Sequence, residues 1–255
     1  MICNCGHDEN KKYKGGKAGD QSETEYAVIN WYDRPWSCVL RYPDANVAEK
    51  IAEVSRAAAN NDEVGYDQNQ RLTYYNNLKA VNWNPASIKT ACESDCSAST
   101  SANIIAAGNT LNIDKLKAIN PSNTTSTLRK ALTAVGFELL MDKKYLSSDK
   151  YLLPGDVLLC DGHHVAVNLT KGSEIKVAYK IGWHNDLNGW WYADTETTYY
   201  KSCWKIINHH KYYFGSDGYA YSGWNKVDGE YYYFEDRAGY KLECAVYPNV
   251  MPEYY

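Results

Sequence analysis

Three tryptophans near the C-terminus recur at an almost constant spacing, and this spacing limits what that part of the chain can form. Trp183, Trp204 and Trp224 are separated by 21 and 20 residues. Eight residues after each one begins an aromatic cluster, and polar turn sequences such as NDLNG and KVDGE lie between. Because short aromatic runs joined by turn residues are typical of β-hairpins, each unit predicts one hairpin of about twenty residues.

A hairpin of this size cannot bury its aromatic face alone, so the hairpins are expected to stack into a solenoid-like module. From Trp183 onward the chain holds five of its eight Trp and 14 of its 24 Tyr. The rings either form the core or line pockets that bind quaternary ammonium groups or sugars. Paired aromatics at every turn exceed what a core needs, which favours binding. The candidate ligand-binding residues are Trp183, Trp191, Tyr192, Trp204, Tyr212, Tyr213, Trp224, Tyr232 and Tyr233.

The repeat sequences are similar to a known family. GWHNDLNGWWYADTE (182–196), CWKIINHHKYYFGSDG (203–218) and GWNKVDGEYYYFEDRAG (223–239) resemble the choline-binding repeats of Gram-positive cell-wall proteins. Related repeats recognise choline on teichoic acid, other wall polymers or α-glucan, so the resemblance implies a wall polymer or glycan partner. The first unit has Ala193 where the others have Phe, and its pocket is therefore expected to be incomplete.

The rest of the chain contains enough aliphatic residues for an ordinary globular core, and its sequence pattern predicts an α+β fold. Apolar residues at helical spacing predict helices at 47–61, 71–80, 97–108 and 126–136. Strand-like runs follow at 137–141, 156–160, 164–169 and 174–179. Helices followed by strands suggest helices packed against one mostly antiparallel sheet. We expect one domain at 1–180, with 1–44 as an N-terminal extension packed on it, and a repeat module at 181–255.

Charge and hydropathy exclude several classes of protein. The net charge of −4 gives no general attraction to nucleic acid or anionic lipid. No apolar run approaches the ~18 residues that cross a bilayer, so no membrane insertion is expected. The start, MICNCGHDENKKYKGG, has no apolar core and no small-residue cleavage site, so we expect cytoplasmic synthesis without a signal peptide. In that reducing compartment most of the eight cysteines are expected to be free thiols, one of them reactive.

The sharpest chemical signal in the first domain is ESDCSAS (93–99). Cys96 stands where a polar loop gives way to a helix that begins near Ser97. Because the start of a helix stabilises negative charge, this position is expected to lower the pKa of the thiol. Cys92, four residues earlier, has no such placement and is interpreted as a small buried apolar residue.

A thiolate nucleophile needs a base, and GDVLLCDGHHVAVNL (155–169) supplies one. Alternation along the predicted strand places His164, Ala166 and Asn168 on one face and His163 on the other. The phase of the strand favours His164 as the base, and a shift of one residue would exchange it for His163. A Cys on a helix and a His on a strand some 70 residues later are typical of Cys–His hydrolases.

DCS at the start of a helix, GD before a strand and HVAV at the next strand resemble the NlpC-type cell-wall peptidases and the phage CHAP amidases. The resemblance implies a papain-like fold that hydrolyses amide bonds in peptidoglycan stem peptides. It assigns Cys96 as nucleophile and His164 as base. In GYDQNQR (65–71) it makes Tyr66 a partner for the oxyanion or the substrate. The third polar residue of the family has no clear counterpart. Asn168 is nominated for it, and a hydrogen-bonded main-chain carbonyl is the alternative.

The N-terminal segment carries a C-x-C-x-H pattern made by Cys3, Cys5 and His7. Structural zinc sites prefer two to four residues between paired Cys and need a fourth ligand, so we expect no metal here and no cofactor. GGKAGDQSETE (15–25) resembles a segment that precedes the catalytic core in phage-type members of the family. Its glycines predict a loop that lies against the core.

These features together predict a peptidoglycan hydrolase, either an N-acetylmuramoyl-L-alanine amidase or a stem-peptide endopeptidase. Wall-binding repeats without a signal peptide suggest a phage or prophage endolysin that a helper pore (holin) or host lysis releases to the bacterial cell wall. One alternative is a non-catalytic wall-binding protein with an inactive papain-like domain. Another is a Cys hydrolase that acts on a small molecule and carries a glucan-binding tail.

Overall fold

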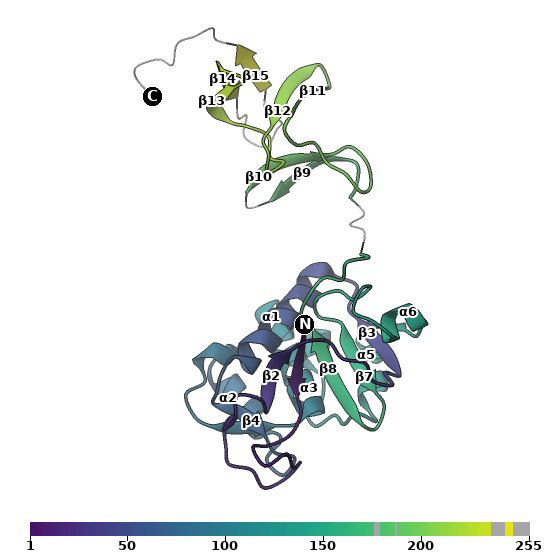
Figure 1. The fold of residues 1–255 in the computed structure, drawn as a ribbon. Helices are drawn as coiled ribbons and strands as arrows, with labels where there is room; N and C mark the ends of the chain where they lie inside the picture. The colour runs from purple at the N-terminus through teal and green to yellow at the C-terminus, as the bar shows by residue number, and fades with distance from the viewer. Residues whose placement is uncertain (176–178, 187, 236–242, 247–255) are drawn as a thin grey trace. The chain divides into compact units, whose positions relative to one another are not determined.

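The computed structural model describes residues 1–175, 179–186, 188–235 and 243–246. The chain divides into two compact units, Met1–Ile175 and Lys176–Tyr255, where the sequence predicts a boundary after residue 180. Each unit has its own set of strands (Figure 1).

A six-stranded sheet forms the centre of the first unit, in the order β2-β1-β8-β7-β3-β6. All five neighbouring pairs are antiparallel. Residues 1–44, predicted as an extension packed on the domain, instead supply three strands of this sheet. The N-terminal strand β1 lies between β2 and β8, so it is an inner strand. The strands are β1 (Ile2–Cys5), β2 (Tyr26–Ile29), β3 (Cys38–Arg41), β6 (Glu138–Leu140), β7 (Val157–Cys160) and β8 (His164–Asn168).

Side chains alternate across this sheet and fill two apolar layers. On β8, Val165 and Val167 pack with the helices, whereas Ala166 packs with Ile2 and Trp36 in a second cluster on the other face. The alternation predicted for residues 164–168 is therefore observed. Both faces of the inner strands are buried.

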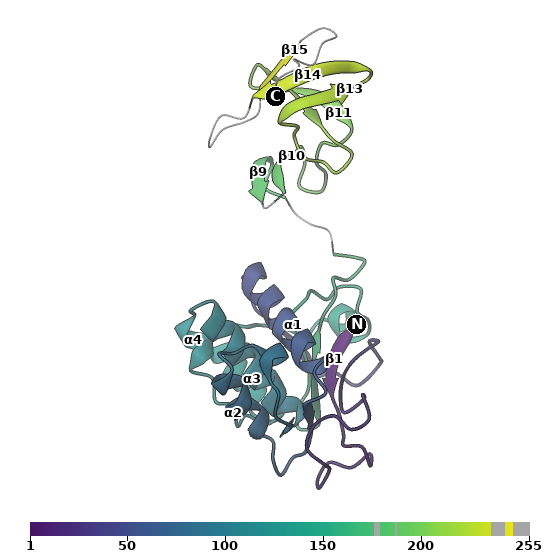
Figure 2. The ribbon, with the colours of Figure 1, turned by 90° about the vertical axis from the view of Figure 1, so that its left-hand side faces the viewer.

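The helices pack mainly on one face of the sheet. Figure 2 shows α1, α2, α3 and α4 together on one side of β1. The helix α3 is the most buried of them, with every residue from Cys96 to Gly108 buried. Its small residues allow this close packing. The helices are α1 (Ala45–Ala59), α2 (Thr73–Ala80), a short 3₁₀ turn (Pro85–Ser87), α3 (Cys96–Thr110), α4 (Asp114–Lys117), α5 (Leu128–Ala134) and α6 (Lys143–Leu146).

A small parallel pair, β4 (Val64–Tyr66) and β5 (Cys92–Ser94), leads into α3 and delivers Cys96 to its first turn. The mixed fold with antiparallel sheets confirms the predicted combination of helices and strands. The strand expected at 174–179 is not supported at its start, because Glu174 lies in a turn. Its residues 176–178 lie outside the described part of the chain.

The second unit is a series of short hairpins, one for each predicted repeat. In the second hairpin the two turn residues Asn208 and His209 both have positive φ, and in the third Asp228 and Gly229 do. Such two-residue turns match the natural twist of paired strands. The pairs are β9 (Gly182–Asp186) with β10 (Gly189–Ala193), β11 (Cys203–Ile207) with β12 (His210–Phe214), and β13 (Gly223–Val227) with β14 (Glu230–Glu235), which also pairs with β15 (Glu243–Val246).

Rings from successive hairpins stack into a core. The ring centroids of Trp183 and of Tyr212, in the second hairpin, lie 4.8 Å apart. Those of Trp204 and of Tyr232, in the third hairpin, also lie 4.8 Å apart. The repeat spacing of the sequence thus reflects one Trp contact per hairpin. None of the helices in the described ranges is long and apolar enough to span a bilayer.

Candidate functional site

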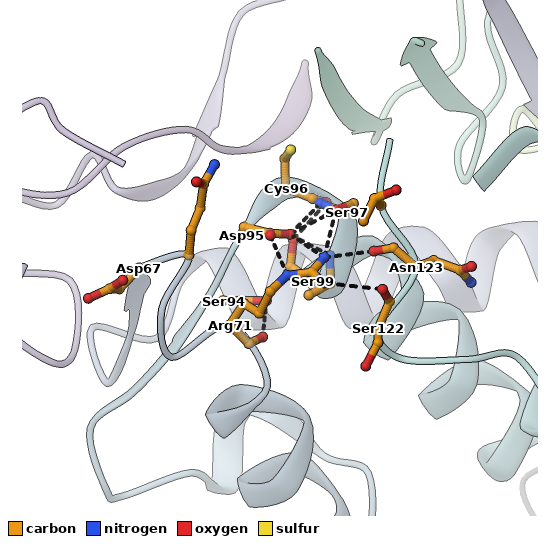
Figure 3. A network of polar contacts seen from close by, with 12 residues as sticks. Asp67, Arg71, Ser94, Asp95, Cys96, Ser97, Ser99, Ser122 and Asn123 are labelled. Atoms are coloured by element: carbon orange, nitrogen blue, oxygen red, sulfur yellow. Dashed lines mark hydrogen bonds and ion pairs between the residues drawn. The ribbon is translucent and has the colours of Figure 1, made fainter. Parts of the chain in front are cut away.

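The first turn of α3 places Cys96 directly after its capping residue, Asp95. The Oδ1 atom of Asp95 accepts hydrogen bonds from the main-chain N–H groups of Ser97 and Ala98 at 2.9 and 2.8 Å. Arg71 forms an ion pair with the same carboxylate and donates to the carbonyl of Asn123. Figure 3 shows the Cys96 side chain pointing away from this network. The network therefore fixes the start of the helix and leaves the sulfur free of it.

The surroundings of Cys96 oppose a resting thiolate. Burial raises the pKa of its thiol to about 12, and the nearby Asp95 carboxylate adds to the effect. Backbone hydrogen bonds from Val165 and Ser97 act in the opposite direction without cancelling it. The prediction that the helix start lowers the pKa of Cys96 is therefore wrong. The contact with Val165 also places the sulfur beside the residue that follows His164.

The ring of His164 is held by a residue from the opposite end of the chain. Its Nε2 atom lies 2.8 Å from Oδ1 of Asn4, on the adjacent strand β1. Because an amide oxygen only accepts hydrogen bonds, Nε2 carries the proton and Nδ1 keeps a lone pair. Trp36 packs near the ring, with centroids 6.2 Å apart. Burial, followed by the charge of Arg34, lowers the pKa of His164 to about 4, so the imidazole is neutral at neutral pH.

Asn168, nominated as the orienting residue, has a different role. Its side-chain amide donates to the main-chain carbonyls of Leu153 and Thr170 at 2.8 and 2.6 Å, and the residue is fully buried. It lies on the same face as His164 but four residues further along β8, so it anchors a loop instead of the ring. The residue that meets His164 is Asn4. Its signal in the sequence was only a polar residue between Cys3 and Cys5.

A cavity of about 440 Å³ joins the candidate residues. Its lining includes Cys96, His164, Asn4 and Tyr66. The sequence-predicted nucleophile, base and oxyanion partner therefore share one hollow, together with the asparagine that the sequence did not reveal. A second cavity of about 360 Å³ also includes Cys96 in its lining. Cys96 therefore borders both cavities.

Tyr66 is buried on β4, and its hydroxyl accepts a hydrogen bond from the Gln68 amide at 3.2 Å. Burial raises the pKa of Tyr66, and Cys96 contributes to the shift. The hydroxyl therefore stays protonated and can donate into the cavity. Gln68 lines both cavities, and the sequence did not single it out.

His163 remains close to the site as well. It is exposed, lines both cavities, and its main-chain N–H donates to the carbonyl of Cys160 in the turn before β8. The hydrogen bond to Asn4 belongs to His164 alone of the two rings. Only His164 is therefore held in a defined tautomer by a side chain in the described contacts.

The N-terminal C-x-C-x-H pattern does not converge. Cys3 and Cys5 are buried under the helices, and the Cys3 thiol donates to the carbonyl of Ser55, whereas His7 lines the larger cavity. Within the described residues, no group of three or more His, Cys, Asp or Glu side chains is placed to hold a metal ion. Seven cysteines with described side chains are free thiols.

The aromatic residues of the second unit divide between core and pocket. Tyr212 is fully buried, so its assignment to ligand binding is wrong, and it belongs to the core. Trp183 and Tyr192 pack against that same core. The indole face of Trp204 is already covered by the Lys211 ammonium, 4.3 Å from the ring centroid. The remaining candidates pack in pairs: Tyr213 on Trp204, Trp224 on Tyr233, and Tyr232 on Trp204.

Trp191 differs from the other candidates because it lines a cavity of about 190 Å³. The other rings of this cavity are Tyr179, Tyr199 and Tyr219, and its lining also includes two carboxylates, Asp186 and Asp217. Asp186 accepts from the Trp191 indole N–H at 3.1 Å and from the Tyr219 hydroxyl at 3.2 Å. Backbone hydrogen bonding from Asn188 is the largest cause that lowers the Asp186 pKa. Rings and negative charge together suit a cation.

Comparison with solved structures gives short matches. A crystal structure of the modular Cpl-1 endolysin complexed with a peptidoglycan analogue is 27% identical over 28% of this chain and 22% of that chain, with a TM-score of 0.20. The multimodular pneumococcal endolysin from phage Cp-1 complexed with choline gives the same values. Choline binding protein F from Streptococcus pneumoniae is 25% identical over 39% of this chain and 33% of that one, also with a TM-score of 0.20.

The chain therefore spans between about a fifth and a third of the length of these solved proteins. No curated protein matches it in sequence. The model of the family described as "endolysin-like domain" matches residues 2–175. That range corresponds to the first compact unit, with the six-stranded sheet and the Cys96 cavity. The chain belongs to the endolysin-like domain family.

Proposed function

We propose that the protein is a cysteine hydrolase that cleaves an amide bond in the stem peptide of peptidoglycan. The observation that carries the proposal is the shared cavity. Its lining includes Cys96, at the start of a helix, and His164, whose Nε2 atom is hydrogen-bonded to Asn4. A nucleophile, a base and a group that orients the base are the parts that acyl transfer to sulfur requires. Membership of a family named for endolysins supports the cell wall as the target.

In the resting site both partners are neutral, because burial raises the pKa of Cys96 to about 12 and lowers that of His164 to about 4. The proton therefore moves when the sulfur attacks the amide carbonyl. Nδ1 of His164 takes it and then gives it to the leaving amine, which leaves an acyl-enzyme joined through a thioester. Water, deprotonated by the same nitrogen, attacks the thioester and releases the acid and the thiol.

Two of the main-chain N–H groups at the start of α3 are not free to bind the oxyanion. Asp95 already takes the N–H groups of Ser97 and Ala98. We assign the N–H of Cys96 itself and the Tyr66 hydroxyl as the donors, since both belong to residues that line the cavity. Two fixed donors in a partly dry site are what oxyanion stabilisation needs.

A stem-peptide substrate fits the position of Cys96 between two cavities. One cavity of about 440 Å³ and another of about 360 Å³ both have Cys96 in their lining. Each can accept the residues on one side of the scissile bond. This arrangement, with Cys96 at the start of a helix and His164 on a later strand, favours an endopeptidase or an N-acetylmuramoyl-L-alanine amidase of the NlpC or CHAP type. With its wall-binding tail, the protein would serve as a phage or prophage endolysin.

The tail supplies affinity for the wall in this proposal. The cavity around Trp191 combines three tyrosine rings with Asp186 and Asp217. A quaternary ammonium such as choline would be attracted by both the rings and the carboxylates, whereas a neutral glycan would gain only from the rings. Choline on a wall polymer is therefore the ligand that we favour, and a glycan is the alternative.

Digestion of purified cell walls tests the catalytic proposal directly. We expect new amino groups to appear with time, and mass spectrometry of the fragments identifies the bond. Separation of lactyl-linked L-alanine from the sugar would indicate the amidase, and shortened stem peptides would indicate the endopeptidase. Release of reducing sugars without new amines would contradict the proposal. Wall binding with no release of either would favour a non-catalytic binding protein.

Asn4→Ala is expected to lower kcat by about ten- to a hundredfold, because the imidazole loses the acceptor that fixes its tautomer. In the wild type kcat/KM should rise with pH through about 4, the pKa of His164, since only the neutral ring accepts a proton. Burial, the largest cause of that shift, is unchanged by the substitution. In Asn4→Ala the plateau of the pH profile should therefore be lower, while the rise of kcat/KM at acid pH should stay near pH 4.

Asn168→Ala is the matched control, because this amide anchors the carbonyls of Leu153 and Thr170 and does not touch the ring. It should lower the free energy of unfolding by about 1–3 kcal/mol. The plateau of kcat should stay near the wild-type value while the protein is folded. If Asn168→Ala lowers kcat as far as Asn4→Ala does, or if Asn4→Ala moves the acid limb toward pH 6.5, the positioning role of Asn4 is wrong.

Trp191→Ala in the full chain is expected to weaken retention on a choline resin by about five- to thirtyfold, because one wall of the cation pocket is removed. Ile206→Ala is the control, since that side chain is 74% exposed. It should bind as the wild type does. Retention that free choline cannot displace would point to a different wall polymer.

A further inference from the structure

The larger cavity beside Cys96 carries positive charge and no negative charge. Arg34 is part of its lining, and His7, His163 and His164 are the other basic residues there. No Asp or Glu belongs to the lining in the part of the chain that the structure describes. A cavity of this charge attracts an anionic group of the substrate.

Arg34 differs from the other cavity residues because it is a fixed cation without a counter-charge. Arg41, Arg71 and Arg129 each form an ion pair with an aspartate. Within the described ranges, Arg34 has no such ion pair. Its side chain hydrogen-bonds the neutral Tyr32 and Cys160, and its Nε atom is buried without a hydrogen-bond partner. A guanidinium whose hydrogen-bond partners are neutral keeps its charge available to an anionic group of the substrate.

Arg34 also lies close to the reacting groups. Its charge is one of the two causes that lower the pKa of His164, so the guanidinium lies within electrostatic reach of that ring. Tyr32, which neighbours it in the lining, donates to Asn4 at 3.3 Å. The guanidinium therefore stands beside the base and its orienting asparagine, on the side of Cys96 served by this cavity.

We propose that Arg34 binds a free carboxylate on a substrate residue next to the scissile amide, and that it thereby selects substrates in which this carboxyl group is not amidated. A guanidinium presents paired N–H donors that match the two oxygens of a carboxylate. A primary amide offers one oxygen and no charge. This inference deepens the proposed function and rests on it, since it names a chemical feature of the same substrate.

Pairs of synthetic stem peptides test the proposal, each pair differing only by conversion of one free carboxylate to its primary amide. For one pair the wild type should show a kcat/KM about ten- to a hundredfold higher with the acid. Arg34→Gln should reduce that ratio to about one, chiefly through a raised KM for the acid. Arg34→Lys should give an intermediate ratio, since it keeps the charge and loses the paired donors. Lys130→Gln removes an exposed charge that lines neither cavity and should keep the wild-type ratio.

Binding measurements separate failure of this inference from failure of the proposed hydrolysis. Calorimetry with the Cys96→Ala protein compares the acid and amide peptides without turnover, and the acid should bind more tightly by a similar factor. If no peptide is cleaved but this preference is found and is lost when Arg34→Gln is added, the carboxylate site stands without the hydrolase. Equal binding and equal cleavage of both members of every pair, or a preference that survives in both Arg34 variants, would overturn the assignment.

Discussion

Replacing Cys96 with alanine is expected to reduce release of amines from cell walls by at least about 10⁴-fold while wall binding remains. The expected loss is this large because no other thiol among the residues described lines the cavity that holds His164 and Asn4. Without sulfur, His164 has no nucleophile to activate, and the acyl-enzyme cannot form. The measurement is the time course of new amino groups from purified walls, together with the amount of protein that sediments with them.

Cys92→Ala is the control for this experiment. Cys92 is also buried, but its thiol donates to the carbonyl of Glu63, the residue before β4, and Cys92 does not line either cavity. Amine release should therefore persist in this variant. Wall clearing by Cys96→Ala at the wild-type rate would end the cysteine-hydrolase interpretation and leave a binding protein or a different catalytic group.

The position of the base could be predicted from local sequence, but the residue that orients it could not. Alternation along residues 164–168 placed His164 on one face of β8, and the structure has that alternation. Asn4 reaches the ring only because β1 pairs beside β8, and 160 residues separate the two side chains. No pattern in either segment specifies that pairing. The sequence around His164 therefore points to Asn168 and not to Asn4.

The protonation state of the Cys96 thiol also depends on packing that cannot be predicted from the sequence. The start of a helix after Asp95 was predictable from the DCS motif and does occur. The pKa of Cys96 does not fall as expected, because α3 is the most buried of the helices that pack on the sheet. Burial of α3 comes mainly from its contacts with α1, α2, α4 and β8, which only the fold determines.

Aromatic periodicity predicted one hairpin per repeat but could not separate core from pocket. Tyr212 and Trp191 occupy equivalent places in their hairpins, each opposite the third residue of the partner strand. Tyr212 is sealed by Trp183 from the preceding hairpin, whereas Trp191 lines a cavity with Asp186 and Tyr219. Whether a ring belongs to the core or lines a pocket depends on which residue packs over it, and the repeat spacing alone does not predict that residue.

Asp95→Ala is expected to lower the free energy of unfolding by about 3–5 kcal/mol, because two contacts that hold the start of α3 are lost. The carboxylate caps the helix through Ser97 and Ala98 and forms the ion pair with Arg71. Both partners are largely buried, with side-chain exposures of 19% for Arg71 and 10% for Asp95, so solvent replaces little of the loss. Urea denaturation followed by circular dichroism measures the change.

Asp95→Asn separates the cap from the charge. Asparagine still accepts the hydrogen bonds of the helix start, and Arg71 keeps the carbonyls of Ser122 and Asn123 as acceptors. The loss should therefore be smaller, about 1.5–3 kcal/mol. Since the Asp95 carboxylate raises the pKa of Cys96, its removal should lower that pKa and speed alkylation of the thiol at about pH 9. Alkylation at the wild-type rate in folded Asp95→Asn would mean that burial alone keeps the nucleophile protonated. The carboxylate would then act on the site only through the shape of the first turn of α3.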